Sequence, residues 1–284
     1  MWDLSSGEPV GRPLWIAPGG VRSIALREGH PEVLIATDQY DAVVGVWNLD
    51  SGEPIRQSHW SHEGEINSVS IGEWRGKTIC VYGNYDGGSG DKPICIWDMA
   101  SGNLMELPLE EEEVSIHAVL LKKWQGKTVL VSGSIDQRIR VWDLDSREQV
   151  GEALQGHGRD DTTLTSLAVG EWQGRTVIVS GNSDAVVQMW DMADRTPLGE
   201  PLPGHSDTIS SIAMREWQGR TMMVTGSHDG TIRLWQPGHR NSRRIDIGSP
   251  VYSVAMGPND TVIVGAELGL MAIKLDLPGD IRLQ

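Results

Sequence analysis

The stretch ISSIAMREWQGRTMMVTGSHDGTIRLWQ, residues 209–236, decides the fold. It contains three runs rich in β-branched and apolar residues, which are separated by the turn sequences QG and HDG. Runs of this composition favour β-strands, and Asp-Gly between two of them is typical of a tight hairpin. Residues 209–236 are therefore expected to form three consecutive antiparallel strands.

The same pattern recurs along the 284 residues of the chain. One series of tryptophans has spacings of 45, 50, 45, 48 and 45 residues, and a second series usually follows the first after 27 residues. The first series comprises Trp2, Trp47, Trp97, Trp142, Trp190 and Trp235, and the second comprises Trp74, Trp124, Trp172 and Trp217. A period near 45 residues indicates an array of structural repeats.

Each period has room for a fourth, outer strand of the TPLGEPLPGH kind, residues 196–205. A small antiparallel sheet with two apolar faces must stack on neighbouring sheets, and radial stacking that closes on itself gives a β-propeller. We therefore predict an all-β protein, a single propeller domain over residues 1–284 with about six four-stranded blades. The blades are expected at approximately 21–63, 64–113, 114–157, 158–205, 206–250, and 251–277 together with 9–16.

The two chain ends are expected to complete one blade. Residues 9–16 are interpreted as an outer strand that pairs with the last unit, which closes the ring and removes its exposed edges. The segment MWDL at residues 1–4 resembles a third strand that has no blade. This suggests the hypothesis that Met1 lies inside a repeat of a longer natural array.

Gly204, His205, Asp229 and Trp235 resemble the Gly-His and Trp-Asp signature of WD40 repeats, and the resemblance covers nearly the whole chain. It extends to bacterial WD40 repeat domain-containing proteins, in which arrays with W-x-G-[KR]-T hairpins are often one part of a larger signalling protein. The resemblance implies a hydrogen-bonded tetrad of His, Ser or Thr, Asp and Trp in each well-formed blade. Two sets have the matching spacing: His157, Ser180, Asp184 and Trp190, and His205, Thr225, Asp229 and Trp235.

The other units depart from that tetrad. The first and third keep only the last three members, and the second keeps His62 and Trp97 but has Tyr82 where Ser or Thr is expected. In the last unit Leu275 takes the place of Trp. The incomplete sets are Thr37, Asp41 and Trp47, and Ser132, Asp136 and Trp142. Because a group repeated around a ring is rarely catalytic, the tetrads are interpreted as structural.

The composition argues against several classes of partner. The net charge of -15 and the pI of about 4.9 disfavour nucleic acid and anionic membranes. Cys80 and Cys95 are too few for a disulfide framework, and no apolar run is long enough for a membrane span. A cytoplasmic location is expected, with no cofactor. The insertion at residues 84–92 lacks the bidentate Glu of a calcium loop, so no metal site is expected.

The best candidates for partner binding precede the turn Asp of each unit, where Tyr40, Tyr85, Ile135, Ser183 and His228 follow one another. In WD40 propellers this position usually looks out from the top rim, and variation there allows specificity. Exposed aromatic residues near a charged rim are typical of binding sites. The predicted site comprises Tyr40, Tyr85, Ile135 and His228 with the acidic run Glu110, Glu111, Glu112 and Glu113.

These observations favour a monomeric, non-enzymatic scaffold or sensor module that binds a protein or peptide on a propeller face. The alternatives are a propeller enzyme or ligand-binding domain acting at the channel mouth, and a structural spacer.

A second candidate surface involves the second tryptophan series, whose members should face Lys77, Lys127, Arg175 and Arg220 across two-residue turns. Cation–π contact across such a hairpin end is plausible. These tryptophans either cap their own hairpins or form a rim that binds an acidic partner.

Overall fold

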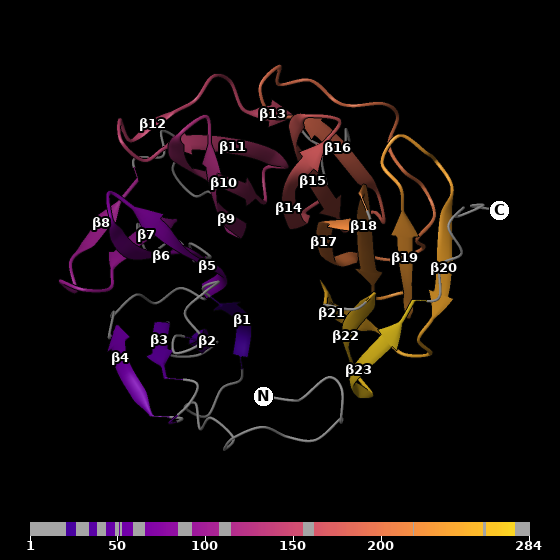
Figure 1. Cartoon of the computed structure of the whole chain (residues 1–284), viewed down its shortest axis with the longest axis horizontal. Helices are drawn as coiled ribbons and strands as arrows, with labels where there is room; N and C mark the ends of the chain where they lie inside the picture. The colour runs from indigo at the N-terminus through magenta and orange to yellow at the C-terminus, as the bar shows by residue number, and fades with distance from the viewer. Residues whose placement is uncertain are drawn as a thin grey trace. The chain divides into compact units, whose positions relative to one another are not determined.

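Strands account for all the regular structure in the described part of this chain. The structure is a computed structural model that describes residues 21–26, 34–38, 44–48, 51, 53–58, 66–84, 93–107, 115–155, 162–217, 219–257 and 260–275. Within these ranges the strands form six antiparallel sheets of three to five strands, and there is no helix (Figure 1). The all-β expectation is therefore confirmed.

The chain divides into two compact units. The first contains residues 1–136 and 140–151, and the second contains residues 137–139 and 152–284. The division falls within β11 (Arg138–Asp143), whose first two residues belong to the second unit and whose last four belong to the first, and each unit is described by itself.

In the first unit each sheet is a meander of strands in sequence order. The first sheet is formed by β1 (Val21–Leu26), β2 (Leu34–Asp38), β3 (Val44–Trp47) and β4 (Pro54–Ser58). The second is formed by β5 (Ile66–Trp74), β6 (Lys77–Asn84), β7 (Ile94–Asp98) and β8 (Leu104–Glu106). The third contains β9 (Ile116–Trp124), β10 (Lys127–Ser134), β11 and β12 (Glu148–Gln149). The start of β11 pairs with β13 (Leu154–Gln155), and these paired residues belong to the second unit.

The second unit continues the same order. Its sheets are formed by β14 (Leu164–Trp172), β15 (Arg175–Asn182) and β16 (Val187–Asp191); by β17 (Ile209–Trp217), β18 (Arg220–Ser227), β19 (Thr231–Trp235) and β20 (Ser242–Asp246); and by β21 (Val251–Met256), β22 (Thr261–Ala266) and β23 (Gly269–Lys274).

The outer strand expected at residues 196–205 is reduced to two isolated bridges, Val187 with Leu202 and Trp190 with Pro197. Pro197, Pro201 and Pro203 lack the N–H that a ladder needs, so a continuous strand cannot form there. The outer strand of the third sheet is likewise split into β12 and β13, around a left-handed Gly151 with φ 65°.

The hairpins joining the first two strands have the register that the sequence predicts. Trp74 pairs with Lys77, Trp124 with Lys127, Trp172 with Arg175, and Trp217 with Arg220. In the first of these turns both central residues, Arg75 and Gly76, have positive φ, and the next two turns share this geometry. Two successive residues with positive φ match the twist of the flanking strands.

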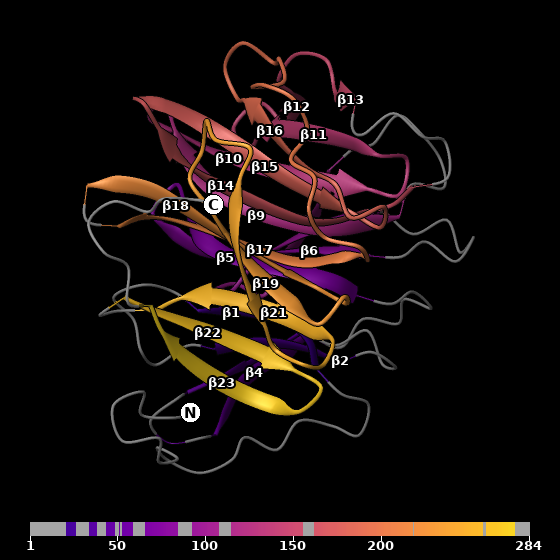
Figure 2. The same ribbon diagram turned by 90° about the vertical axis from the view of Figure 1, so that its right-hand side faces the viewer.

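Within each unit, neighbouring sheets pack with their first strands side by side. Strand β5 contacts β1 and β9, and β17 contacts β14 and β21 (Figures 1 and 2). Glycine makes this approach possible: a Cβ on Gly83 would lie 2.5 Å from Ile116 Cγ2, and one on Gly181 would lie 2.5 Å from Ile209 Cγ2. Gly83 and Gly181 are therefore required for this packing.

Hydrogen bonds also join these first strands. The hydroxyls of Ser23, Ser68 and Ser211 accept the backbone N–H of Val69, Val119 and Val254 on the next sheet, at 3.2, 3.1 and 3.1 Å. In three sheets, the side chain of the residue just before this serine position also donates a hydrogen bond to the next sheet. These donors are Asn67 to Ile116 O at 3.1 Å, Thr165 to Ile209 O at 2.5 Å and Ser210 to Val251 O at 2.5 Å.

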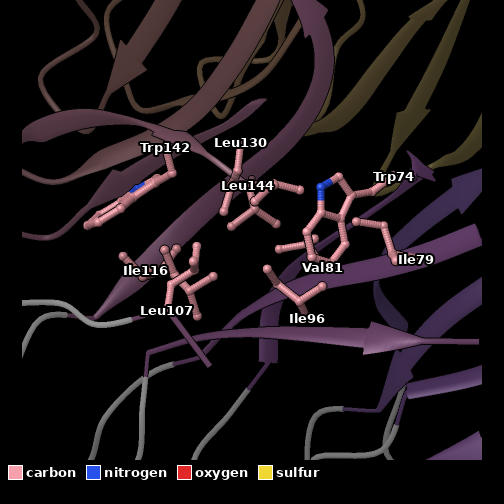
Figure 3. Close-up of a cluster of buried hydrophobic side chains, with 11 residues drawn as sticks. Trp74, Ile79, Val81, Ile96, Leu107, Ile116, Leu130, Trp142 and Leu144 are labelled. Carbon is pink, nitrogen blue, oxygen red and sulfur yellow. The ribbon is translucent and has the colours of Figure 1, made fainter. Parts of the chain in front are cut away.

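Buried apolar side chains fill the space between packed sheets. Figure 3 shows one such cluster, in which Trp74, Ile79 and Val81 of the second sheet meet Leu130 and Trp142 of the third. In the second unit a corresponding cluster joins β17–β20 to β21–β23. Leu275, which stands in the place of Trp, is buried in that cluster at 5% exposure.

Candidate functional site

The structure brings together all four residues of the tetrad in the β17–β20 sheet. Trp235 Nε1 donates to Thr225 Oγ1 at 2.9 Å, and the same oxygen lies 2.8 Å from His205 Nε2. His205 Nδ1 lies 2.9 Å from Asp229 Oδ2. Since Thr225 accepts the indole N–H, its own proton is available to His205 Nε2, which assigns the imidazole proton to Nδ1 and Asp229.

Burial sets the protonation of this tetrad. Burial lowers the pKa of His205 and outweighs the opposing influence of Asp229. Burial acts to raise the pKa of Asp229, but hydrogen bonds from Thr231, the Ser206 N–H and His205 together lower it to about 2. At neutral pH the pair is therefore a neutral imidazole and a carboxylate.

The tetrad resembles a catalytic triad in composition but not in accessibility. The His205 side chain and Thr225 are both 0% exposed, and the Thr225 hydroxyl is already engaged by Trp235. A nucleophile must reach its substrate, so this group serves the fold rather than chemistry.

Other sheets keep part of the arrangement. Trp190 donates to Ser180 at 2.9 Å, and Trp142 donates to Ser132 at 3.0 Å. Asp184 is exposed, and Trp47 and Trp97 are buried. His62, His157, Asp41 and the Thr37 side chain lie outside the described residues.

The third sheet shows how the turn Asp is held without a histidine. Arg140, which is 5% exposed, forms an ion pair with Asp136 at 2.7 Å and donates to Ser134 Oγ at 2.9 Å. A buried guanidinium thus supplies the donors that His205 and its neighbours supply elsewhere. In the second sheet, Tyr82 at the Ser or Thr position is itself buried among Cys80, Cys95 and Trp97, and burial raises the pKa of its hydroxyl.

Three of the four basic residues at the hairpin ends bind acidic residues of their own sheets. Lys77, Lys127 and Arg175 form ion pairs with Asp98, Asp143 and Asp191 of their own sheets, at 2.7, 2.5 and 2.8 Å. The pKa of Asp98 and that of Asp143 are lowered chiefly by the hydrogen bond from the lysine. These acids are the Asp of each Trp-Asp pair, so the idea of a free basic rim does not hold for these three sheets.

The tryptophans of these hairpins connect sheets instead. Trp74 Nε1 donates to Asp145 at 3.0 Å, on the turn that follows β11, and Trp217 Nε1 donates to Asp260 at the start of β22. The cation above the Trp74 ring is its neighbour Arg75, at 4.8 Å from the ring centroid.

Two of the predicted partner-binding residues can be placed. Ile135 in the first unit is 43% exposed, and His228 in the second is exposed. Tyr40, Tyr85, Glu110, Glu111, Glu112 and Glu113 lie outside the described residues.

Sequence reasoning missed an aromatic partner of His228. The ring of Tyr252, which is 53% exposed, lies 5.6 Å from the His228 ring in an edge-to-face arrangement. Tyr252 occupies the strand position at which Asn67, Thr165 and Ser210 bind the next sheet. That irregularity, a large aromatic residue among small polar ones, was the available signal.

Together the registers, the tetrad and the sheet-to-sheet packing define a repeat protein built from antiparallel sheets. The model of the family described as "WD domain, G-beta repeat" matches residues 123–143 and 195–236. These two segments are WD40 repeats, so the chain contains WD40 repeats. A search of curated proteins found no match.

The described ranges contain no group of three or more His, Cys, Asp or Glu side chains placed to hold a metal ion. No helix in those ranges is both long and apolar enough to span a membrane.

Proposed function

We propose that this chain is a non-enzymatic protein-binding module. WD40 repeats generally mediate protein–protein interaction. The observation that carries the proposal is the contact between His228 and Tyr252, two rings that remain exposed although they touch each other. Exposed aromatic groups held in a fixed geometry are typical of binding hot spots.

These rings belong to a larger exposed surface in the second unit. We name it the turn surface and define it by His228, Tyr252 and Leu268, the last of which is 75% exposed. Each part is held to its own sheet by the backbone, because His228 N–H donates to Thr208 O at 3.1 Å and Glu267 N–H donates to Pro250 O at 3.1 Å. The surface therefore lies at the ends of two packed sheets.

Acidic side chains accompany the turn surface. Asp207, Asp184 and Glu267 are exposed on the segments that flank it, and Thr208 links two of these segments by donating to Ser183 O at 3.4 Å. An apolar and aromatic centre with acidic neighbours suits a protein segment that has an apolar anchor flanked by Lys or Arg. The net charge of -15 would favour encounter with such a partner.

The proposal extends to the corresponding positions of the other repeats. Ile135 occupies the position of His228 in the third sheet and is exposed. Tyr40, Tyr85 and the run from Glu110 to Glu113 are assigned to partner binding on the basis of their sequence positions. We also infer that the six sheets are the blades of one closed, monomeric propeller in the cytoplasm, with residues 9–16 pairing beside β23.

An enzyme acting at a channel mouth is the weaker alternative. It needs accessible acid, base or nucleophilic groups that converge on one point. The His–Asp–Thr group of this chain is buried, and no specific observation among the described residues favours catalysis.

Affinity purification from the native cell extract tests the proposal, with the wild-type chain beside Tyr252→Ser combined with Leu268→Ser. Glu200→Ala, in an exposed loop, is the matched control. A protein retained by the wild type and the control and lost by the double variant supports the turn surface. Equal retention by all three chains would contradict it, provided that circular dichroism shows the same strand content.

A further inference from the structure

The hairpin-end ion pair described above is a repeated device with one exception. In β5–β8, β9–β12 and β14–β16 the basic residue that follows the first turn binds the Asp that follows the repeat Trp. In β17–β20 the residue after Trp235 is Gln236. Gln236 cannot form the ion pair, so the basic residue of this hairpin, Arg220, loses the partner that its counterparts have.

Arg220 remains an accessible cation. It is exposed, and no hydrogen bond or ion pair to it occurs among the residues that the structure describes. Asp260, which precedes β22, accepts the Trp217 N–H.

A further arginine lies at the same end of the sheet as Arg220. Met223 pairs with Trp235, so Arg220 and Gln236 lie on one face of the sheet, at the end where β17 turns into β18. Arg240 is exposed in the turn between β19 and β20, a turn closed by the bond from His239 N–H to Gln236 O at 3.1 Å. Figure 1 shows β18, β19 and β20 as neighbours in this sheet.

The local charge is opposite to that of the chain. Residues 206–250 contain six arginines and four acidic residues, whereas the rest of the sequence contains 18 basic and 35 acidic residues. No acidic residue occurs between Gln236 and Ile245, a segment that includes Arg240, Arg243 and Arg244. The sheet therefore presents a cationic end within an anionic protein.

We propose that Arg220 and Arg240, which we name the arginine surface, bind an acidic segment of another protein. Guanidinium groups bind carboxylates by paired hydrogen bonds, and a segment with consecutive Asp or Glu side chains can engage several of them. A nucleic acid fits less well, since its dense negative charge would be repelled by the remainder of this chain. The arginine surface does not include the turn surface, and each can fail without the other.

The test is the binding of a fluorescein-labelled peptide with six consecutive glutamates, followed by fluorescence anisotropy at low ionic strength. Its counterpart with six glutamines and a DNA duplex are the comparison probes. The variants are Arg220→Gln combined with Arg240→Gln, and Gln236→Asp, which restores the acid found in the other three sheets. Arg175→Gln is the control, because it removes an equivalent arginine that is already paired.

An exposed ion pair contributes about 0.2–1 kcal/mol, or roughly a 1.4- to fivefold change in affinity. The double variant should therefore bind the glutamate peptide about two- to 25-fold more weakly, and Gln236→Asp about 1.4- to fivefold more weakly. Arg175→Gln should bind it like the wild type. Equal binding of the glutamine peptide, equal loss in Arg175→Gln, unchanged affinity in the double variant, or tighter binding of the duplex would each overturn the proposal.

Discussion

Replacing Thr225 with Val tests the role of the tetrad in the fold. Valine keeps the shape of the side chain and removes the hydroxyl that Trp235 and His205 share at 2.9 and 2.8 Å. The site is 0% exposed, so water cannot replace the lost bonds. The variant therefore leaves two buried polar groups, the indole N–H and the imidazole Nε2, without their partner.

Leaving one buried polar group unsatisfied costs about 1–3 kcal/mol. Two such groups predict a decrease of about 2–6 kcal/mol in the free energy of unfolding, which is a large share of a typical stability of about 5–15 kcal/mol. The variant should expose the region around Trp235 at a lower urea concentration than the wild type. Urea titration followed by tryptophan fluorescence measures this difference.

Two matched controls separate the hydroxyl from the methyl group. Thr225→Ser keeps the shared oxygen and should retain most of the stability. Thr196→Val makes the same chemical change at an exposed position and should leave the midpoint within about 0.5 kcal/mol of the wild type. If Thr225→Val were as stable as Thr225→Ser, the tetrad would not be a significant source of stability.

Three more predictions concern stability. Gly181→Ala should lower the free energy of unfolding by about 1–3 kcal/mol in urea titration, because the new Cβ meets the Ile209 side chain at 2.5 Å. Adding Ile209→Ala should recover part of the loss. Full stability in the single variant would refute this packing. Arg140→Leu should lower the free energy of unfolding by about 2–4 kcal/mol, since Asp136 keeps a partly buried charge without its ion pair. Combining Arg140→Leu with Asp136→Asn should cause a smaller loss. Equal losses in the two variants would argue against the ion pair. The fold lowers the pKa of His205, so the stabilisation from this side chain is present above its unfolded pKa of about 6.5 and is lost as the pH falls below that value, because the unfolded chain then takes up the proton. From pH 7 to pH 5 the free energy of unfolding of the wild type should therefore fall more than that of His205→Gln. Parallel pH profiles of the two proteins would contradict this.

Local features of the structure could be predicted from the sequence. The strands, the hairpin registers from Trp74 to Lys77 and from Trp217 to Arg220, and the partners of the β17–β20 tetrad depend on short spacings within one repeat. A two-residue turn permits one register for the two strands that it joins. A buried hydroxyl ten residues before a tryptophan has few possible hydrogen-bond partners other than the indole N–H.

Contacts that depend on how sheets pack were not predictable in the same way. The Ser68 and Ser211 bonds and the Trp74 bond to Asp145 join residues 43 to 71 positions apart, and spacing alone does not align two separate sheets. Arg140 was missed because its role depends on the absence of a histidine on another segment. The absence of a continuous outer strand at residues 196–205 could have been predicted, since the prolines of this segment cannot donate to a β-ladder.

The central claim is that the turn surface contacts a protein. Site-specific photo-crosslinking tests it directly, with p-benzoylphenylalanine placed at Tyr252 or, as a control, at the exposed Thr196, and with the chain expressed in its own cells. The account predicts a discrete, higher-mass product from position 252 that is absent from position 196 and is lost when Leu268→Ser is added. No product at position 252, or the same products at both positions, would contradict it.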